Sequence, residues 1–210
     1  MTTTLFTNAH IATGEPGSTA ASTLPLQDIL VTDGVFTAFG PGLAQQYEAQ
    51  GGDPAAIEVV DLGGKLVCPP FCDTHLHLDY VFTARKPGAV NESGTLFEGI
   101  QRWSETKSDL TVDEIKQRAK IGIKKEMLHG VQLIRSHADV TDPNLTSLKA
   151  LLELKEELKD TVTLQIVSFP QEGMYSYEGP HGESGAELVE EGLKMGADCV
   201  GGIPHFEQCR

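Results

Sequence analysis

The fold is decided by the stretch Leu66-Val-Cys-Pro-Pro-Phe-Cys-Asp-Thr-His75-Leu-His77-Leu-Asp79. It joins a short apolar strand, two prolines and a second apolar segment to a group of polar side chains. Residues i and i+2 of a strand point to the same face, so the imidazoles of His75 and His77 can reach one metal ion. Neutral imidazole suits zinc and iron. Taken alone the His-x-His pattern is weak, and paired polar histidines at a strand end are the competing interpretation.

Downstream of this stretch, the sequence alternates between short apolar strands and amphipathic helices. Two helices are predicted from the capping sequences Thr111-Val-Asp-Glu114 and Ser184-Gly-Ala-Glu187, and a third is expected to begin at Asp142-Pro143. Such alternation predicts an α/β fold with a parallel sheet, either an open doubly wound sheet or a (β/α)8 TIM barrel. Further strands are predicted at residues 131–134, 161–169 and 199–203.

Polar residues directly follow each predicted strand. In both candidate architectures active sites lie at the carboxyl ends of the strands, so this edge of the sheet is the candidate active site. No glycine-rich phosphate-binding sequence follows the first strand, which argues against a bound nucleotide. The polar residues are His75 and His77, His137 and Asp139, Gln171 and Glu172, and His205 and Glu207.

The length of the chain bounds how much of a barrel it can form. A complete barrel needs about 250 residues, so residues 66–210 are expected to supply about the first four of its eight strands. Residues 1–65 are expected to form a small N-terminal β-domain, antiparallel and part of a sandwich-like arrangement. Within it, Asp33-Gly34 between two β-rich runs predicts a hairpin, and residues 40–56 are interpreted as a loop.

The net charge and the apolar content of the chain limit the classes of molecule that it is expected to bind. The net charge of −14 repels phosphate backbones, so a nucleic-acid partner is excluded and a small neutral molecule remains. No apolar run approaches the ~18 residues of a membrane span, and the first residues lack the features of a secretory signal, which favours a cytoplasmic protein. Cys68 and Cys72 are expected to be buried, unpaired thiols, with a zinc knuckle shared with His75 and His77 as the less favoured alternative.

From about Val59 onward the sequence resembles the amidohydrolase superfamily, motif by motif and in order. Residues 69–79 are similar to the first-strand signature of that superfamily. Four later segments resemble specifically its cytosine deaminase branch. They are Ser93-Gly-Thr-Leu96-Phe-Glu-Gly99-Ile with Arg102-Trp103, Arg135-Ser-His137-Ala-Asp139-Val, Leu164-Gln-Ile-Val-Ser-Phe-Pro170-Gln171-Glu172-Gly173, and Gly202-Ile-Pro204-His205-Phe-Glu207.

The resemblance implies a role for several of these residues. His75 and His77 would be ligands of one divalent metal ion, Fe2+ or Zn2+. Gln171 would hydrogen-bond the amide-like edge of a pyrimidine, since a carboxamide offers both a donor and an acceptor. Leu96 would line the pocket of the base. The implied reaction is metal-dependent hydrolysis of a C–N bond that is not a peptide, converting cytosine to uracil and ammonia as in pyrimidine metabolism.

Other polar residues at the strand ends are interpreted less specifically. His137 and Asp139 either support the metal ligands from behind or bind loop amides as a strand-end pair. His205 and Glu207 are expected to support the pocket in the same indirect way. Glu172 is expected to be structural rather than catalytic, and Trp103 to belong to the core.

In the resembling family, the remaining metal ligands and the proton-shuttling glutamate follow later strands, at positions beyond Arg210. The chain alone is therefore expected to have no catalytic glutamate and no turnover, and a longer form to be a homo-oligomer. Two alternatives stay open. The same scaffold could act on isoguanine, creatinine or a substituted triazine, or the chain could be a truncated, non-catalytic half-barrel with exposed apolar faces.

Overall fold

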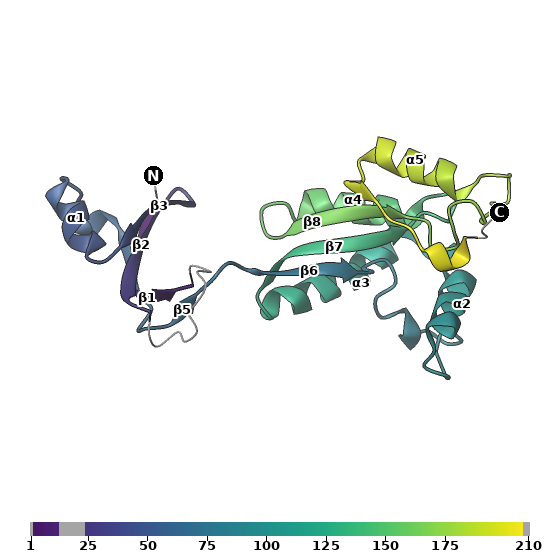
Figure 1. Ribbon diagram of the computed structural model, residues 1–210, viewed down its shortest axis with the longest axis horizontal. Coiled ribbons are helices and arrows are strands. Elements are labelled where there is room, and N and C mark those ends of the chain that lie inside the picture. Colours follow the sequence, from purple (N-terminus) through teal and green to yellow (C-terminus); the bar gives the residue numbers. More distant parts are fainter. Residues whose placement is uncertain (1, 13–23, 208–210) are drawn as a thin grey trace. The chain divides into compact units, whose positions relative to one another are not determined.

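A computed structural model describes residues 2–12 and 24–207 of the chain. The chain divides into two compact units, Met1–Pro69 and Pro70–Arg210 (Figure 1). Each unit has a sheet of its own. Both contain helices and strands, which confirms the predicted mixed α/β class.

The first unit is built on one five-stranded sheet in the order β3-β2-β1-β4, with β5 also pairing with β1. The predicted hairpin is present, because β2 and β3 pair antiparallel on either side of Asp33-Gly34, and both residues have positive φ, 52° and 78°. The expectation of a purely antiparallel sheet is wrong, since β4 and β5 pair parallel with β1. The strands are β1 Thr3–Ile11, β2 Leu26–Thr32, β3 Val35–Gly40, β4 Glu58–Asp61 and β5 Leu66–Val67.

The segment interpreted as a loop in this unit contains a helix, α1 Leu43–Ala49, and a 3-10 turn, η2 Pro54–Ala56. Helix α1 is seven residues long and follows Gly42, which adopts a left-handed conformation and provides no side-chain cap. Leu43 is its buried residue. A helix this short, without a cap or an apolar repeat, leaves no signal in the sequence.

The second unit is an open parallel sheet in the order β6-β7-β8-β9, so strands that follow one another in the chain are neighbours in space. Helices connect these strands and lie beside the sheet in Figure 1. The strands are β6 Phe71–Leu76, β7 Val131–Asp139, β8 Thr163–Phe169 and β9 Cys199–Val200. The helices are α2 Leu96–Thr106, α3 Val112–Leu128, α4 Thr146–Glu157 and α5 Gly185–Met195, with 3-10 turns η3 Thr83–Arg85, η4 Lys107–Asp109 and η5 Pro204–Phe206.

One apolar core holds the second unit together. Ile134 of β7 and Ile166 of β8 meet Ile115 of α3 and Leu151 of α4, and all four side chains are fully buried. These helices are amphipathic as predicted, and their apolar faces pack on the sheet. The core fixes the strands side by side and brings their carboxyl ends to one edge.

Both capping sequences begin a helix as predicted, and at α3 the Thr111 hydroxyl accepts a hydrogen bond from the backbone N–H of Glu114, whereas the start predicted for α4 is wrong. Ser184 and Glu187 form a reciprocal capping box at α5. Helix α4 begins at Thr146 rather than at Asp142-Pro143, because Leu145 takes a left-handed conformation with φ 50°. The Asp142 carboxylate accepts hydrogen bonds from the backbone N–H groups of residues 144 and 146 and holds that turn.

The expectation of buried thiols is also wrong for two cysteines. Cys68, between β5 and β6, and Cys72, near the start of β6, are both exposed. Within the described ranges, none of the helices combines the length and the apolar composition that crossing a membrane requires.

Candidate active site

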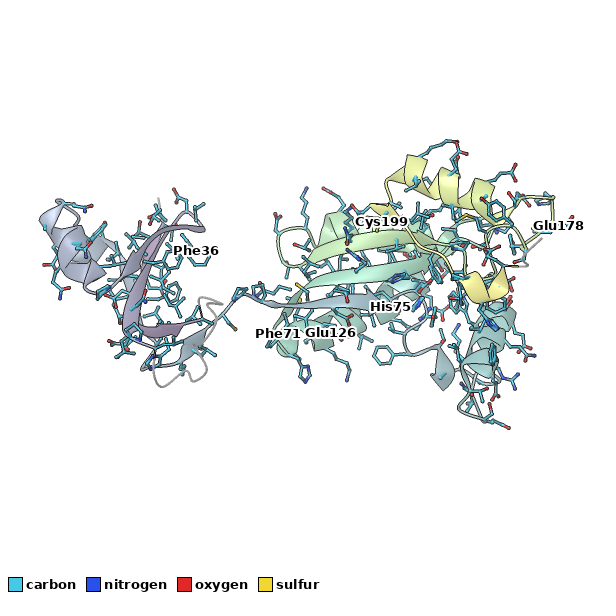
Figure 2. All side chains as sticks on the ribbon, in the orientation of Figure 1. Phe36, Phe71, His75, Glu126, Glu178 and Cys199 are labelled. Atoms are coloured by element: carbon cyan, nitrogen blue, oxygen red, sulfur yellow. The ribbon has the colours of Figure 1, made fainter. Side chains whose placement is uncertain are left out.

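Three histidines gather at the carboxyl ends of β6 and β7. His75 lies at the end of β6 (Figure 2), His77 follows that strand, and His137 lies near the end of β7. The imidazole of His75 stacks on that of His137 with 4.1 Å between ring centroids. The His77 ring lies 5.3 Å from the His75 ring and 5.5 Å from the His137 ring. The structure thus brings both predicted metal ligands together with a third imidazole.

The surroundings of His77 suit a metal ligand. Its Nδ1 lies 3.1 Å from the backbone carbonyl oxygen of His137, so Nδ1 carries the proton and donates, and the lone pair of Nε2 remains available. Burial, with smaller contributions from His137 and His75, lowers the pKa of His77 to about 4, which keeps the ring neutral at neutral pH. Nδ1 of His137 is itself buried without a hydrogen-bond partner among the described residues.

These donors fit part of a metal site. Two imidazoles at one strand end are suitable zinc or iron ligands. The described residues nevertheless contain no group of three or more His, Cys, Asp or Glu side chains arranged to hold an ion. This finding gives the zinc-knuckle alternative at Cys68 and Cys72 no support.

A cavity of about 500 Å3 adjoins the histidines. Gln171, which follows β8 and is 4% exposed, contributes to its wall, as does Leu96 at the first turn of α2. Tyr80 links the cavity to the histidines, because its ring lines the cavity and stacks on His77 with 4.5 Å between centroids. The structure therefore brings both predicted pocket residues to one cavity. Its remaining lining residues are Phe82, Thr83, Ala84, Ala89, Asn91, Gly94, Thr95, Gly99, Ile100, Arg102 and Trp103.

Behind the histidines lies a buried polar network centred on Asp139. Its carboxylate accepts hydrogen bonds from the indole N–H of Trp103 at 2.7 Å and from Nζ of Lys107 at 3.1 Å. Its backbone N–H donates to the carboxylate of Asp79 at 2.9 Å. Burial raises the pKa of Asp79 to about 7. The core position expected for Trp103 is found, yet its indole also makes a specific polar contact.

Glu172 extends the same network. Its carboxylate pairs with Lys107 and accepts a hydrogen bond from Ser104 at 2.7 Å. Opposing influences act on Lys107, where burial lowers the pKa and the neighbouring carboxylates of Asp139 and Glu172 raise it, with a net increase. The contacts of Glu172 thus join the loop after β8 to the end of α2.

The last predicted pair, His205 and Glu207, lies in a different environment. The carboxylate of Glu207 accepts hydrogen bonds from the backbone N–H groups of Met174 and Tyr175, which holds the loop after β8. The ring of His205 lies 5.0 Å from that of Phe97 on α2. These contacts are with loop and helix residues beside the cavity.

Tyr80 and Lys107 are site residues that the sequence interpretation missed. Tyr80 stands three residues after His77. In the sequence this spacing indicates no contact, because the two rings meet only through the turn that the chain makes after β6. Lys107 stands four residues after Trp103, so the helical repeat puts both on one face. That repeat was the available signal for Lys107, although it does not show which carboxylate would face it.

The parallel sheet, the paired histidines at its strand ends and the adjoining cavity define the class of protein. It is an α/β protein whose candidate active site lies at the carboxyl ends of parallel strands. A family model described as "Amidohydrolase family" matches residues 58–209. The chain therefore belongs to the amidohydrolase family, which confirms the resemblance inferred from the sequence.

Individual relatives agree with this assignment. The chain is 35% identical over 148 residues to N-isopropylammelide isopropyl amidohydrolase of Pseudomonas sp. (strain ADP), covering 69% of this chain and 36% of that protein. Among solved structures, 5-methylcytosine deaminase from Klebsiella pneumoniae superposes with a TM-score of 0.79 and 41% identity over 98% of this chain and 45% of its own. N-isopropylammelide isopropylaminohydrolase from Burkholderia multivorans gives a TM-score of 0.70 at 25% identity over 95% of this chain and 44% of its own. The chain thus spans less than half the length of these relatives.

Proposed function

We propose that the chain contributes to the active site of a metal-dependent hydrolase that acts on the C–N bond of a cyclic amidine. Cytosine is the proposed substrate, with uracil and ammonia as products. The observation that carries this proposal is the stack of Tyr80 on His77, because it sets a candidate metal ligand against the wall of a cavity that also holds a buried carboxamide. The similarity to 5-methylcytosine deaminase supports a pyrimidine substrate.

His75 and His77 would hold one divalent ion, Fe2+ or Zn2+. A bound ion of this kind lowers the pKa of water towards ~7 and so supplies a nucleophile at neutral pH. For that purpose the chain contributes two imidazoles, of which burial keeps that of His77 neutral. The hydrogen bond from Nδ1 of His77 to the His137 carbonyl fixes the ring plane and directs Nε2 away from the backbone.

Gln171 would recognise the base. Its carboxamide can accept from a ring N–H and donate to a ring carbonyl, which matches one edge of cytosine. Because Gln171 is 4% exposed, water competes little with the substrate for its carboxamide. A substrate lacking that edge would therefore leave buried polar atoms unpaired. Leu96 and the ring of Tyr80 would cover the faces of the base.

The complete protein is proposed to contain more strands than the four of the described parallel sheet. The order β6-β7-β8-β9, with each strand joined to the next through helical segments, supports residues 66–210 as the first part of a (β/α)8 barrel preceded by a small β-domain over residues 1–65. The remaining metal ligands and the proton-shuttling glutamate would come from residues outside this chain. We propose that the longer form is a cytoplasmic homo-oligomer and that these 210 residues alone do not turn over cytosine.

Two further readings remain as proposals. Relatives that act on other ring systems, such as the N-isopropylammelide hydrolase, favour testing isoguanine, creatinine and substituted triazines beside cytosine. A non-catalytic half-barrel is the alternative of a different class. Its open sheet edges and apolar faces would make it self-associate, so a monodisperse monomer in size-exclusion chromatography would count against it.

The proposal is tested by metal content and by deamination. We expect His75→Ala and His77→Ala to lose bound Fe2+ or Zn2+ in elemental analysis, whereas His181→Ala, at an exposed loop histidine, keeps it. In the complete enzyme, Gln171→Leu is expected to raise the KM for cytosine about 100-fold, because two hydrogen bonds to the base are lost. Undiminished ammonia release after full removal of metal by a chelator would contradict the mechanism. Turnover of cytosine by the 210-residue chain alone would contradict the proposed incompleteness of its site.

A further inference from the structure

Helix α2 forms one wall of the cavity but has little apolar backing. Among its described residues only Trp103 is buried, while Leu96 and Phe97 are 71% and 59% exposed. Its close backbone neighbour is the short turn η4, and it lies beyond the carboxyl end of β6 in Figure 1. A helix with one buried side chain cannot be held in place by apolar burial alone. Something else must set its distance from the strand ends.

Polar anchors provide that attachment, and all of them come from the same end of the helix. Trp103 donates its indole N–H to Asp139 Oδ2 at 2.7 Å. Ser104 donates to Glu172 Oε1 at 2.7 Å. Nζ of Lys107, in η4, donates to Asp139 Oδ2 at 3.1 Å. Three residues at the end of α2 and the start of η4 thus reach carboxylates that end β7 or follow β8.

Asp139 accepts two of these three hydrogen bonds, and its hydrogen-bonding capacity is full. Oδ2 accepts from Trp103 and Lys107, and Oδ1 accepts from the backbone N–H and the hydroxyl of Thr141 at 2.8 and 2.6 Å. Asp139 is 1% exposed, so each of these bonds is shielded from water. A carboxylate suits four donors, whereas an amide in its place would turn an N–H2 group towards two of them.

Asp139 also connects to the strand that carries the candidate metal ligands. Its backbone N–H donates at 2.9 Å to Asp79 Oδ2, two residues after His77. Trp103 contacts Tyr80, with 4.7 Å between ring centroids, and Tyr80 stacks on His77. A polar path and an aromatic path therefore both run from α2 to the end of β6.

We infer that Asp139 is a positioning residue, which anchors Trp103 and Lys107 and thereby sets the α2 wall of the pocket against the histidine-bearing strand ends. This role goes beyond the proposed function, because it assigns to Asp139 no contact with metal or substrate. It rests on the proposed function only where cytosine serves as the probe. Without the anchor, α2 loses its fixed distance from Gln171, which weakens binding of the base more than it slows the chemical step.

Trp103 makes the anchor measurable without any ligand, because it is the single tryptophan of the chain. We expect Asp139→Asn to raise the acrylamide quenching constant of Trp103 fluorescence severalfold, with unchanged far-ultraviolet circular dichroism. Glu105→Gln is the matched control, since Glu105 lies on the same helix and hydrogen-bonds Gln101 and Arg102 at the surface. If Asp139→Asn fails to fold, Lys107→Met removes one donor to the same carboxylate and is expected to give a smaller increase in quenching.

Steady-state kinetics of the complete enzyme with cytosine separate positioning from a purely structural role. Asp139→Asn and Trp103→Phe are each expected to raise KM about tenfold, as the loss of one charge-assisted hydrogen bond does, and to change kcat by less than about threefold. The KM of the double variant should be no higher than that of the poorer single variant, because both changes break the hydrogen bond between Trp103 and Asp139.

Each outcome decides the role of Asp139. A fall in kcat with unchanged KM would show that Asp139 acts in the chemistry or on the metal and would overturn the inference. Unchanged Trp103 quenching in folded Asp139→Asn would overturn it as well. If the unaltered enzyme neither binds nor deaminates cytosine, the proposed function fails, and the quenching measurement still decides whether Asp139 anchors α2.

Discussion

Replacing Ser136 by alanine tests whether a single side chain holds the backbone after β6 in place. Ser136 lies in β7 with 0% exposure, and its Oγ accepts a hydrogen bond from the backbone N–H of Leu78 at 3.0 Å. Leu78 is fully buried between His77 and Asp79. Without the hydroxyl, that N–H is left in the core with no partner, at a cost of about 1–3 kcal/mol. We expect Ser136→Ala to lower the free energy of unfolding by about 2 kcal/mol.

Ser168 of β8 provides the matched control. It is also 0% exposed, but its Oγ donates to the carbonyl oxygen of Val189, 3.2 Å away within helix α5. Ser168→Ala removes a donor and leaves no backbone N–H unpaired, so we expect a loss below about 1 kcal/mol. The same substitution is thus made at two equally buried serines, one whose hydroxyl accepts from a backbone N–H and one whose hydroxyl donates to a backbone carbonyl.

Urea unfolding followed by Trp103 fluorescence is the appropriate measurement. Trp103 lies in the second compact unit, so its signal reports the unfolding of that unit whether or not the first unit unfolds with it. The midpoint should fall in Ser136→Ala while the slope stays the same. Equal losses in the two alanine variants, within about 0.5 kcal/mol, would refute the reasoning that an orphaned Leu78 N–H is the cause.

Three further predictions concern the helices of the second unit. Gly192→Ala should lower the unfolding free energy by about 1–3 kcal/mol in urea titration, because a Cβ there would stand 2.5 Å from Ser168 Oγ and overpacking outweighs the better helix propensity of alanine. Leu151→Ala should cost about 2–5 kcal/mol in the same assay through the cavity it leaves in the core. Hydrogen bonds from Ser184 lower the pKa of Glu187, so its contribution to stability is complete above the ordinary value of 4.5 and is lost as pH falls through the lowered value. Glu187→Gln, which can still cap, should reduce that acid-side loss in thermal melts, and an identical pH profile would contradict this reasoning.

The elements that the sequence predicted are those with a local physical signature. The hairpin at Asp33-Gly34 needs two residues with positive φ, and the pair is suited to it. The capping box at Ser184 is a contact within four residues. The start of α4 was misplaced because the left-handed conformation of Leu145 is imposed by the turn that Asp142 holds. A leucine in that conformation has no pattern of its own.

The candidate site likewise contains residues that the sequence could predict and contacts that only the structure shows. His75, His77 and Gln171 could be selected because they lie at or just after the carboxyl ends of strands, where parallel sheets place their active sites. The contact of Trp103 with Asp139 joins residues 36 positions apart on different elements. An indole in an amphipathic helix is ordinarily core, and only the packed structure shows that its N–H faces a carboxylate.

The two strand ends carry the same short pattern, His77-Leu78-Asp79 and His137-Ala138-Asp139, yet the structure gives the two acids opposite surroundings. Asp139 receives two donors on each carboxylate oxygen, including the ammonium of Lys107. Asp79 has one oxygen buried without a partner among the described residues, and burial raises its pKa to about 7. Identical residues at identical spacing therefore differ in their hydrogen-bond partners, because Trp103 and Lys107 reach Asp139 from another part of the chain. For that reason the sequence could identify Asp139 as a candidate but could not assign the anchoring role to it.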